Sequence, residues 1–278
     1  MDGAHGAGGG GGGGGASTNG GTAGHGGNGA DCGGGGGGGG LSSAGGGAGG
    51  SGGGGCIVVT TMATAPAWQY VSTANHGCNA DNGSGTTLSC TASAGVNNGN
   101  SVVVCTYATA STAPTSISVT DSIHTPTTYT AVGSIYTYIG AYAIQMFYYG
   151  PFSGTPSSTT FTMTTSGSSG SLGNGIIVNE YSGLTPALDT SAGAYYNATT
   201  ATNVPSGTFT PSTLNDLMMA CSFAAANPTA GAGYTARQSG VNNVYKISED
   251  AIATTTSSQT APFVNASTTA VTAGAAFK

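Results

Sequence analysis

The chain has very few charged side chains. Its 278 residues include 3 Lys and Arg and 9 Asp and Glu, so that charged residues make up 4% of the chain, where globular proteins usually carry about 25%. A nucleic-acid-binding protein needs a basic face for phosphates, and a polybasic membrane-surface protein needs a cluster of Lys and Arg. Both classes are therefore disfavoured, and so are most enzymes, because general acids and bases are scarce. The formal net charge is −6, so we expect Ser, Thr, Asn and exposed backbone to provide solubility.

Long apolar runs are lacking as well. The most apolar stretch, residues 217–226, is too short to cross a bilayer as a helix, so we expect no transmembrane segment. Residues 1–3 carry no basic charge and no apolar stretch follows them, which predicts no standard secretion signal. Export by another route, a fragment of a longer chain, or a virion component made inside a host cell would each account for this.

Glycine is abundant and unevenly distributed. Residues 1–55 hold 33 of the 53 glycines, including unbroken runs at 8–15 and 33–40, with almost no apolar side chains for a core. We therefore expect a Gly-rich segment over residues 1–55 and a folded body over residues 56–278. The segment is either a flexible linker or a polyglycine II bundle, in which extended chains with three residues per turn bond to one another.

The body has the pattern of an all-β domain. Residues 116–120 and 160–164 alternate polar and apolar side chains, which predicts half-buried strands. In residues 142–148 one face holds Tyr142, Ile144, Met146 and Tyr148, opposite Ala143, Gln145 and Phe147. The continuous apolar runs 102–105 and 176–178 predict strands that are covered on both faces or central in a sandwich. Many short strands and polar turns, with no helical periodicity, predict an antiparallel β-sandwich, jelly-roll-like. Further strands are expected near 68–74, 86–93, 127–132, 206–210, 216–225, 243–248, 259–264 and 268–277.

Four short motifs resemble those of one group of proteins. The motifs are Val-Thr-Asp-Ser at 119–122 with Thr-Tyr-Thr at 128–130, Glu-Tyr-Ser-Gly at 180–183, Asp-Leu-Met-Met-Ala at 216–220 and the closing Ala-Ala-Phe-Lys. They are similar to motifs of secreted bacterial and phage-associated β-sandwich domains. The resemblance covers about residues 68–278. It implies a jelly-roll-like sandwich of the kind found in surface proteins, adhesins and tail fibres. It is specific to a fold and not to an activity.

Six cysteines in a polar, extracellular-looking chain favour disulfides. We expect Cys78–Cys90 around a turn-rich loop, Cys32–Cys56 across the Gly-rich segment, and Cys105–Cys221 between two core strands; free buried thiols are the alternative for the last pair. We expect no zinc site, because His76-x-Cys78 is too sparse and no Cys-x-x-Cys motif occurs. We also expect no cofactor.

Tyrosine and asparagine supply the candidate contact sites. Tyrosines gather in two places: Tyr136, Tyr138 and Tyr142, and Tyr195 and Tyr196. Their rigid apolar rings with a hydroxyl suit a subunit contact or sugar stacking, although ordinary strand packing is the simpler explanation. Three Asn-x-Ser/Thr sequences are potential N-glycosylation sites, which would stay unused in a bacterial or phage protein: Asn82, Asn197 and Asn265.

Carboxylates and hydroxyls offer few catalytic arrangements. Asp121, Ser122 and His124 have the residue types of a hydrolytic triad, but Asp121 capping a strand-end turn beside an exposed His124 is the better interpretation. Glu180 and Asp189 have the residue types of a glycosidase pair, and the loop 81–84 offers oxygens for calcium without a full ligand set.

These observations leave three hypotheses. The leading one is a non-enzymatic structural subunit of an extracellular or virion fibre or surface assembly that associates with itself and binds no nucleic acid. The second is a carbohydrate-binding adhesin or receptor-binding module at the cell surface. The third, a glycosidase or esterase, would depend on Glu180 or Ser122.

Overall fold

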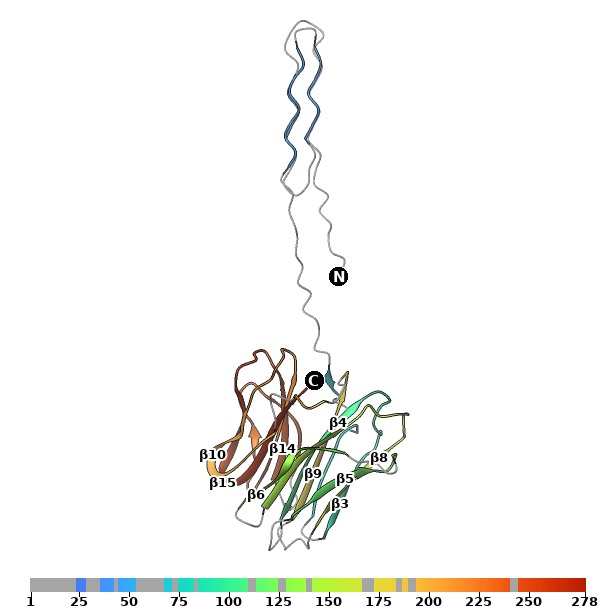
Figure 1. The fold of residues 1–278 in the computed structure, drawn as a ribbon, viewed down its shortest axis with the longest axis vertical. Helices are drawn as coiled ribbons and strands as arrows, with labels where there is room; N and C mark the ends of the chain where they lie inside the picture. Colours follow the sequence, from blue (N-terminus) through green and yellow to red (C-terminus); the bar gives the residue numbers. More distant parts are fainter. Residues whose placement is uncertain are drawn as a thin grey trace. The chain divides into compact units, whose positions relative to one another are not determined.

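The chain divides into two compact units, Met1–Ala63 and Thr64–Lys278. The computed structural model describes residues 24–28, 36–42, 45–53, 68–71, 75–82, 85–109, 114–124, 129–138, 142–166, 173–183, 187–189, 194–240 and 245–278. Within these residues the secondary structure is entirely β, as the composition predicts (Figure 1).

The second unit contains three antiparallel sheets. In the middle sheet the order of neighbouring strands is β1 (Gln69–Tyr70), β9 (Asn174–Ser182), β4 (Ser101–Thr109), β7 (Tyr142–Tyr149) and β6 (Thr130–Tyr138), and β2 (Cys78–Asn82) also pairs with β9. The C-terminal sheet runs β10 (Ala194–Phe209), β15 (Gln259–Phe277), β11 (Leu217–Ala224), β14 (Tyr245–Ile252), β13 (Thr235–Gly240), with β12 (Thr229–Ala230) also on β15. The small sheet is β3 (Thr87–Ala92), β8 (Thr159–Thr165), β5 (Ile117–Asp121).

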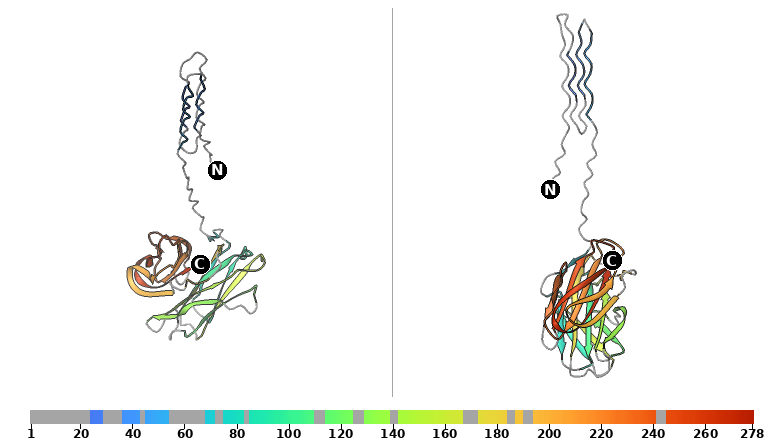
Figure 2. Two further views of the ribbon diagram at one scale, coloured as in Figure 1. Left: turned by 45° about the horizontal axis from the view of Figure 1, so that its top comes forward. Right: turned by 90° about the vertical axis from the view of Figure 1, so that its left-hand side faces the viewer.

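The sheets stack in three layers with the middle sheet covered on both faces (Figure 2). One core joins the middle and C-terminal sheets through residues such as Ile144, Met146 and Phe223. A second core joins the middle and small sheets through residues such as Phe147 and Phe161. The expected antiparallel β-sandwich is thus confirmed, with three layers where a jelly roll has two.

Burial explains the sequence patterns. Strands β4 and β9 read as continuous apolar runs because each contributes alternate side chains to both cores, and β4 is buried along its whole length. In contrast, β5 and β3 alternate buried and exposed positions, because the small sheet has one face against the core. The strands predicted to be covered on both faces and the strands predicted to be half-buried are thus confirmed.

Two disulfides connect the layers. Cys78–Cys90 joins β2 of the middle sheet to β3 of the small sheet, and Cys105–Cys221 joins β4 of the middle sheet to β11 of the C-terminal sheet. Both pairings are those expected from the sequence, so the alternative of free thiols at the second pair does not hold. The expected pair Cys32–Cys56 lies outside the described residues.

In the first unit, extended glycine segments bond to one another through their backbones. The N–H of Gly37 donates to the carbonyl of Gly27 at 2.9 Å, the N–H of Gly50 to the carbonyl of Gly37 at 2.7 Å, and the N–H of Gly26 to the carbonyl of Ala48 at 2.9 Å. Each of three segments therefore bonds to the other two, without forming a β-ladder: 24–28, 36–41 and 45–53.

Close approach of these backbones requires glycine at every third position. A Cβ added to Gly36 or Gly39 would lie 1.9 or 1.6 Å from a facing carbonyl oxygen, whereas one on Gly38 would meet nothing within 4 Å. The side chains of Ala48 and Ser51, also three residues apart, are exposed. Most of residues 1–55 lie outside the described part, so polyglycine II for the whole segment stays a prediction.

Candidate functional site

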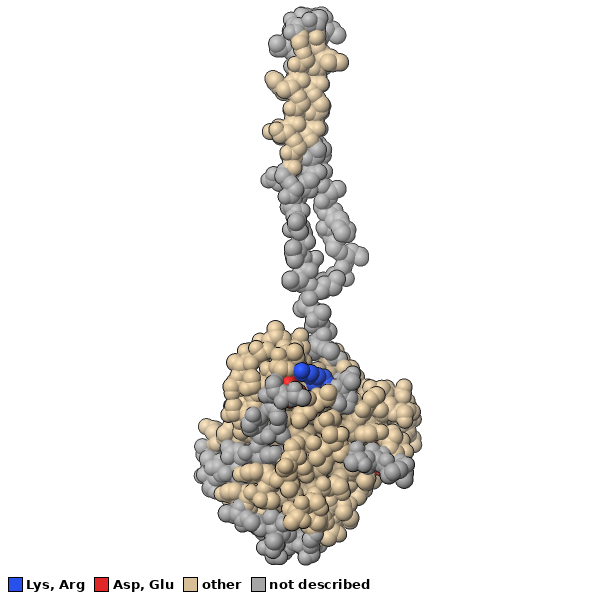
Figure 3. All heavy atoms as spheres, viewed as in Figure 1, with Lys and Arg blue, Asp and Glu red and all other residues tan. Residues whose placement is uncertain are grey.

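The charged side chains of the second unit are almost all internal. Arg237 and Lys278 keep 24% and 45% of their side-chain surface exposed, while the other eight charged residues are buried or have fully buried side chains. They are Asp81, Asp121, Glu180, Asp189, Asp216, Lys246, Glu249 and Asp250. On the face of the body in Figure 3 the visible Lys and Arg atoms lie in one small area, and few Asp and Glu atoms are seen.

A pocket of about 800 Å³ in the body is a candidate binding site. It is lined by β1 and by the strands and loops of the C-terminal sheet, and we refer to it as the Trp68 pocket. Its lining combines aromatic rings with hydroxyl, amide and charged groups: Trp68, Gln69, Tyr70, Tyr234, Thr235, Arg237, Asp250, Thr254, Gln259, Thr260 and several smaller apolar residues.

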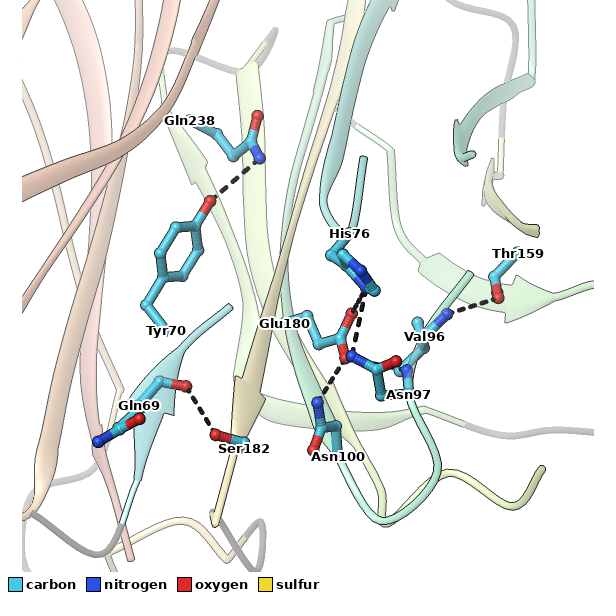
Figure 4. A network of polar contacts seen from close by, with 10 residues as sticks. All are labelled: Gln69, Tyr70, His76, Val96, Asn97, Asn100, Thr159, Glu180, Ser182 and Gln238. Carbon is cyan, nitrogen blue, oxygen red and sulfur yellow. Dashed lines mark hydrogen bonds and ion pairs between the residues drawn. The ribbon is translucent and has the colours of Figure 1, made fainter. Parts of the chain in front are cut away.

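The aromatic rings of the Trp68 pocket are held in place by their own contacts. The indole N–H of Trp68 donates to the carbonyl of Asn215 at 2.9 Å, and its ring meets Tyr181 edge-on. The guanidinium of Arg237 lies 4.6 Å from the centre of the Tyr70 ring. The Tyr70 hydroxyl accepts a hydrogen bond from the side-chain amide of Gln238 (Figure 4). Burial raises the pKa of Tyr70, so this residue is a neutral hydrogen-bonding group.

The carboxylate of Asp250 is fully engaged. Arg237 donates to its two oxygens at 2.8 and 2.6 Å, and the hydroxyl of Tyr181 donates to it at 2.9 Å. Burial lowers the pKa of Arg237, but its hydrogen bond and attraction to Asp250 outweigh this and raise the pKa. Asp250 is the only carboxylate among the described residues of the pocket lining. The Trp68 pocket therefore has the groups to bind a polar ligand, without a carboxylate free to act as a base.

A second polar centre surrounds Glu180 on β9. Its buried carboxylate accepts hydrogen bonds from the N–H of Asn97 at 2.9 Å and the amide of Asn100 at 2.5 Å, and pairs with His76 at 3.1 Å (Figure 4). These contacts hold the loop after β3 against the middle sheet. Asp189 belongs to a different network, in which it accepts from the N–H of Ser212 and faces Lys278. Glu180 and Asp189 thus serve separate structural networks.

The residues around Asp121 form the turn that the sequence favours. The carboxylate of Asp121 accepts hydrogen bonds from the N–H groups of Ile123 and His124, at 2.7 and 2.8 Å, and from the hydroxyl of Tyr129. The expectation that His124 is exposed is wrong: its side chain is 17% exposed, because the ring packs against Tyr149 and Phe152. The hydroxyl of Ser122 instead accepts from the N–H of Thr160.

The predicted tyrosine contacts lie largely within the sandwich. Tyr136, Tyr138 and Tyr142 are partly buried against the core between the middle and C-terminal sheets, where Tyr142 stacks on Tyr107. Ordinary packing therefore accounts for most of their surface. Tyr195 and Tyr196 pair through their backbones with Gly274 and Ala273 on β15, and their side chains are not described.

The remaining predicted sites are untested. The side chains of Asn82, Asn197 and Asn265 lie outside the described residues, as does part of the loop 81–84, so N-glycosylation and calcium binding there stay predictions. In the described part of the chain no three His, Cys, Asp or Glu residues gather in an arrangement suited to a metal ion. The Trp68 pocket itself was missed, since its residues come from distant parts of the sequence.

None of the described secondary structure is a helix able to span a membrane. Comparisons of the chain with protein-family models, with curated proteins and with solved structures find no match.

Proposed function

We propose that the protein is a non-enzymatic structural subunit of an extracellular or virion fibre or surface assembly. The observation that carries this proposal is the withdrawal of charge from the surface of the body into buried pairs and networks. The cores of protein interfaces are depleted in charged residues, because an unpaired buried charge is costly to desolvate. A body with hardly any surface charge has interface-like composition over wide areas, and neighbouring copies can pack on it without desolvating charges.

The Gly-rich segment supplies a second means of association. Its described segments already bond backbone to backbone, with glycine at each crowded position. Because these bonds use no side chains, the same bonding can join chains from different copies. The two disulfides between layers support an oxidising, extracellular location. This combination is consistent with the resemblance to surface and tail-fibre domains.

A pair of glycine substitutions in the full chain tests the proposal. Gly39→Ala places a methyl group 1.6 Å from the carbonyl oxygen of Gly47, whereas Gly38→Ala has open space. Light scattering and electron microscopy should show fibres or a fixed oligomer for the wild type and for Gly38→Ala, and smaller particles for Gly39→Ala. Equal assembly of all three would assign association to the β-body alone. A monomeric wild-type chain would refute the structural role.

The Trp68 pocket supports a second candidate function, carbohydrate binding at a surface. Sugars are bound by aromatic faces together with neutral hydroxyl and amide groups, and Tyr70, Tyr234, Gln69 and Gln259 are of these types. Trp68 is the only tryptophan in the chain, so its fluorescence reports directly on occupancy of the pocket. A glycan array followed by fluorescence titration should give a saturable change that Tyr234→Ala weakens. The absence of any glycan signal would remove this candidate.

A further inference from the structure

Lys246 is buried in a chain that has almost no other lysine. Its side chain is 1% exposed, and Lys278 is the only other lysine. Lysine is almost never fully buried unless it has a partner. Lys246 adds nothing to the charge of the surface, so the reason for its presence lies in its internal contact.

That contact belongs to a row that joins two layers. Lys246, Ser248 and Asp250 alternate on β14 and therefore point to the same face of the C-terminal sheet. All three reach the middle sheet: Ser248 donates to Asn179, Asp250 accepts from Tyr181, and Lys246 pairs with Asp81 of β2. The row fixes the position of β14 opposite β2 and β9 and thereby holds Lys246 at Asp81.

The Lys246–Asp81 pair is in direct contact and enclosed. The ammonium Nζ meets the carboxylate Oδ2, and the Asp81 side chain is 0% exposed. The backbone of β13 covers the pair at Gly240, where an added Cβ would lie 3.4 Å from Lys246 Nζ and 2.7 Å from Asn79 Oδ1. A glycine at this position lets β13 approach closely, and the site keeps little space for solvent.

Such a site favours reaction between the two groups. Removing an ammonium and a carboxylate from water costs free energy that their attraction often fails to offset. Conversion of the pair to a neutral amide eliminates both charges. Two reacting groups held together also react at a very high effective concentration, because no further freedom is lost on the way to reaction.

We propose that Lys246 and Asp81 form an intramolecular amide cross-link between the C-terminal and middle sheets. A proton passes from the ammonium to the carboxylate, and the neutral amine nitrogen attacks Cγ of Asp81. The C–N bond forms, the C–OH bond breaks, and the hydroxyl leaves with a proton from the nitrogen as one water molecule. Nothing is oxidised or reduced, and no further reactant is needed.

The cross-link would complement the disulfides. Cys105–Cys221 joins the same two layers through β4 and β11, and reduction breaks it. An amide between β2 and β14 resists reduction and keeps the sheets joined. The inference rests on the contacts of Lys246 alone and stands whether or not the protein assembles.

Trypsin provides a direct test, because the chain offers only two internal cleavage sites, after Arg237 and after Lys246. Trypsin does not cut after a lysine whose amine has become an amide. In a digest of reduced, denatured full-length protein we expect no free peptide 238–246 and no free peptide 247–278. After cleavage at Arg237 the two parts should remain joined, and the mass of the joined product should be lower by one water molecule than the sequence requires. Release of peptide 238–246 with its full mass would show an ion pair only and overturn the proposal.

Asp81→Ala is the control variant in the same chain. It removes the carbonyl carbon that is attacked, so it should release both peptides and show no loss of water. Because the digest is read on denatured protein, the wild-type result decides the proposal even if this variant folds poorly. A variant that stays cross-linked and is lighter by one ammonia molecule would identify Asn79 as the true partner and refute the assignment to Asp81.

Discussion

Glu249 offers the sharpest test of the buried charges. It lies on β14, is 0% exposed, and accepts a hydrogen bond from the N–H of Gly231 at 2.9 Å. Burial raises the pKa of its carboxyl group to about 8, the Gly231 hydrogen bond opposes this, and the nearby Asp250 adds to it. The carboxyl group is therefore protonated in the folded state near neutral pH.

The sign of the pH dependence follows from proton binding. Between pH 4.5 and about pH 8 the folded state holds a proton on Glu249 that the unfolded state has lost. Because the folded state binds more protons, the free energy of unfolding falls as pH rises through this window. Each pKa unit is worth about 1.4 kcal/mol, so near neutral pH the loss relative to acidic pH is roughly 3 kcal/mol.

Glu249→Gln removes this titration while keeping the shape and the acceptor for Gly231. We expect the variant and the wild type to have similar unfolding free energies at acidic pH. The variant should become more stable than the wild type by roughly 3 kcal/mol near neutral pH. Urea unfolding at a series of pH values measures the difference. A difference that stays constant across the window, or that shrinks as pH rises, would refute the reasoning.

Three further predictions concern the layers. Loop-closure entropy gives about 5 kcal/mol of stabilisation for Cys105–Cys221, with a sequence separation of 116, and about 3 kcal/mol for Cys78–Cys90, with a separation of 12. Replacing both Cys105 and Cys221 by Ala should therefore lower the unfolding free energy more than replacing both Cys78 and Cys90. The opposite order in urea unfolding would contradict this. Phe223→Ala, at the core between the middle and C-terminal sheets, should cost about 3–5 kcal/mol in urea unfolding, and a cost below 1 kcal/mol would show a poorly packed core. The midpoint of urea unfolding should change little between low and high salt, because buried pairs are screened much less than surface ones; a strong salt dependence would mean that exposed charges matter.

Local patterns allowed much of the fold to be predicted. Ile117 and Val119 alternate with polar residues, and they are buried as the alternation requires. Strand β10 was expected only near 206–210, although it begins at Ala194. Its first half contains Tyr and Thr, which favour strands, but polar and apolar side chains do not alternate there, so the pattern predicts no strand. Pairing with β15 keeps this segment extended.

The candidate binding site depended on contacts between distant segments. Trp68, Arg237 and Asp250 are far apart in sequence and meet in the Trp68 pocket only because β1 lies beside the C-terminal sheet. The cross-sheet contact of Lys246 with Asp81 has the same origin. No spacing rule links such residues, so the sequence carried no signal for either.

The sequence by itself determined the all-β class, the half-buried strands and the strands covered on both faces, because these follow from composition, from alternation of polar and apolar residues, and from continuous apolar runs. The tertiary structure alone decided that the sandwich has three layers and that its charges are internal. A side chain becomes internal through the sheet that packs over it, and that sheet comes from a distant part of the chain.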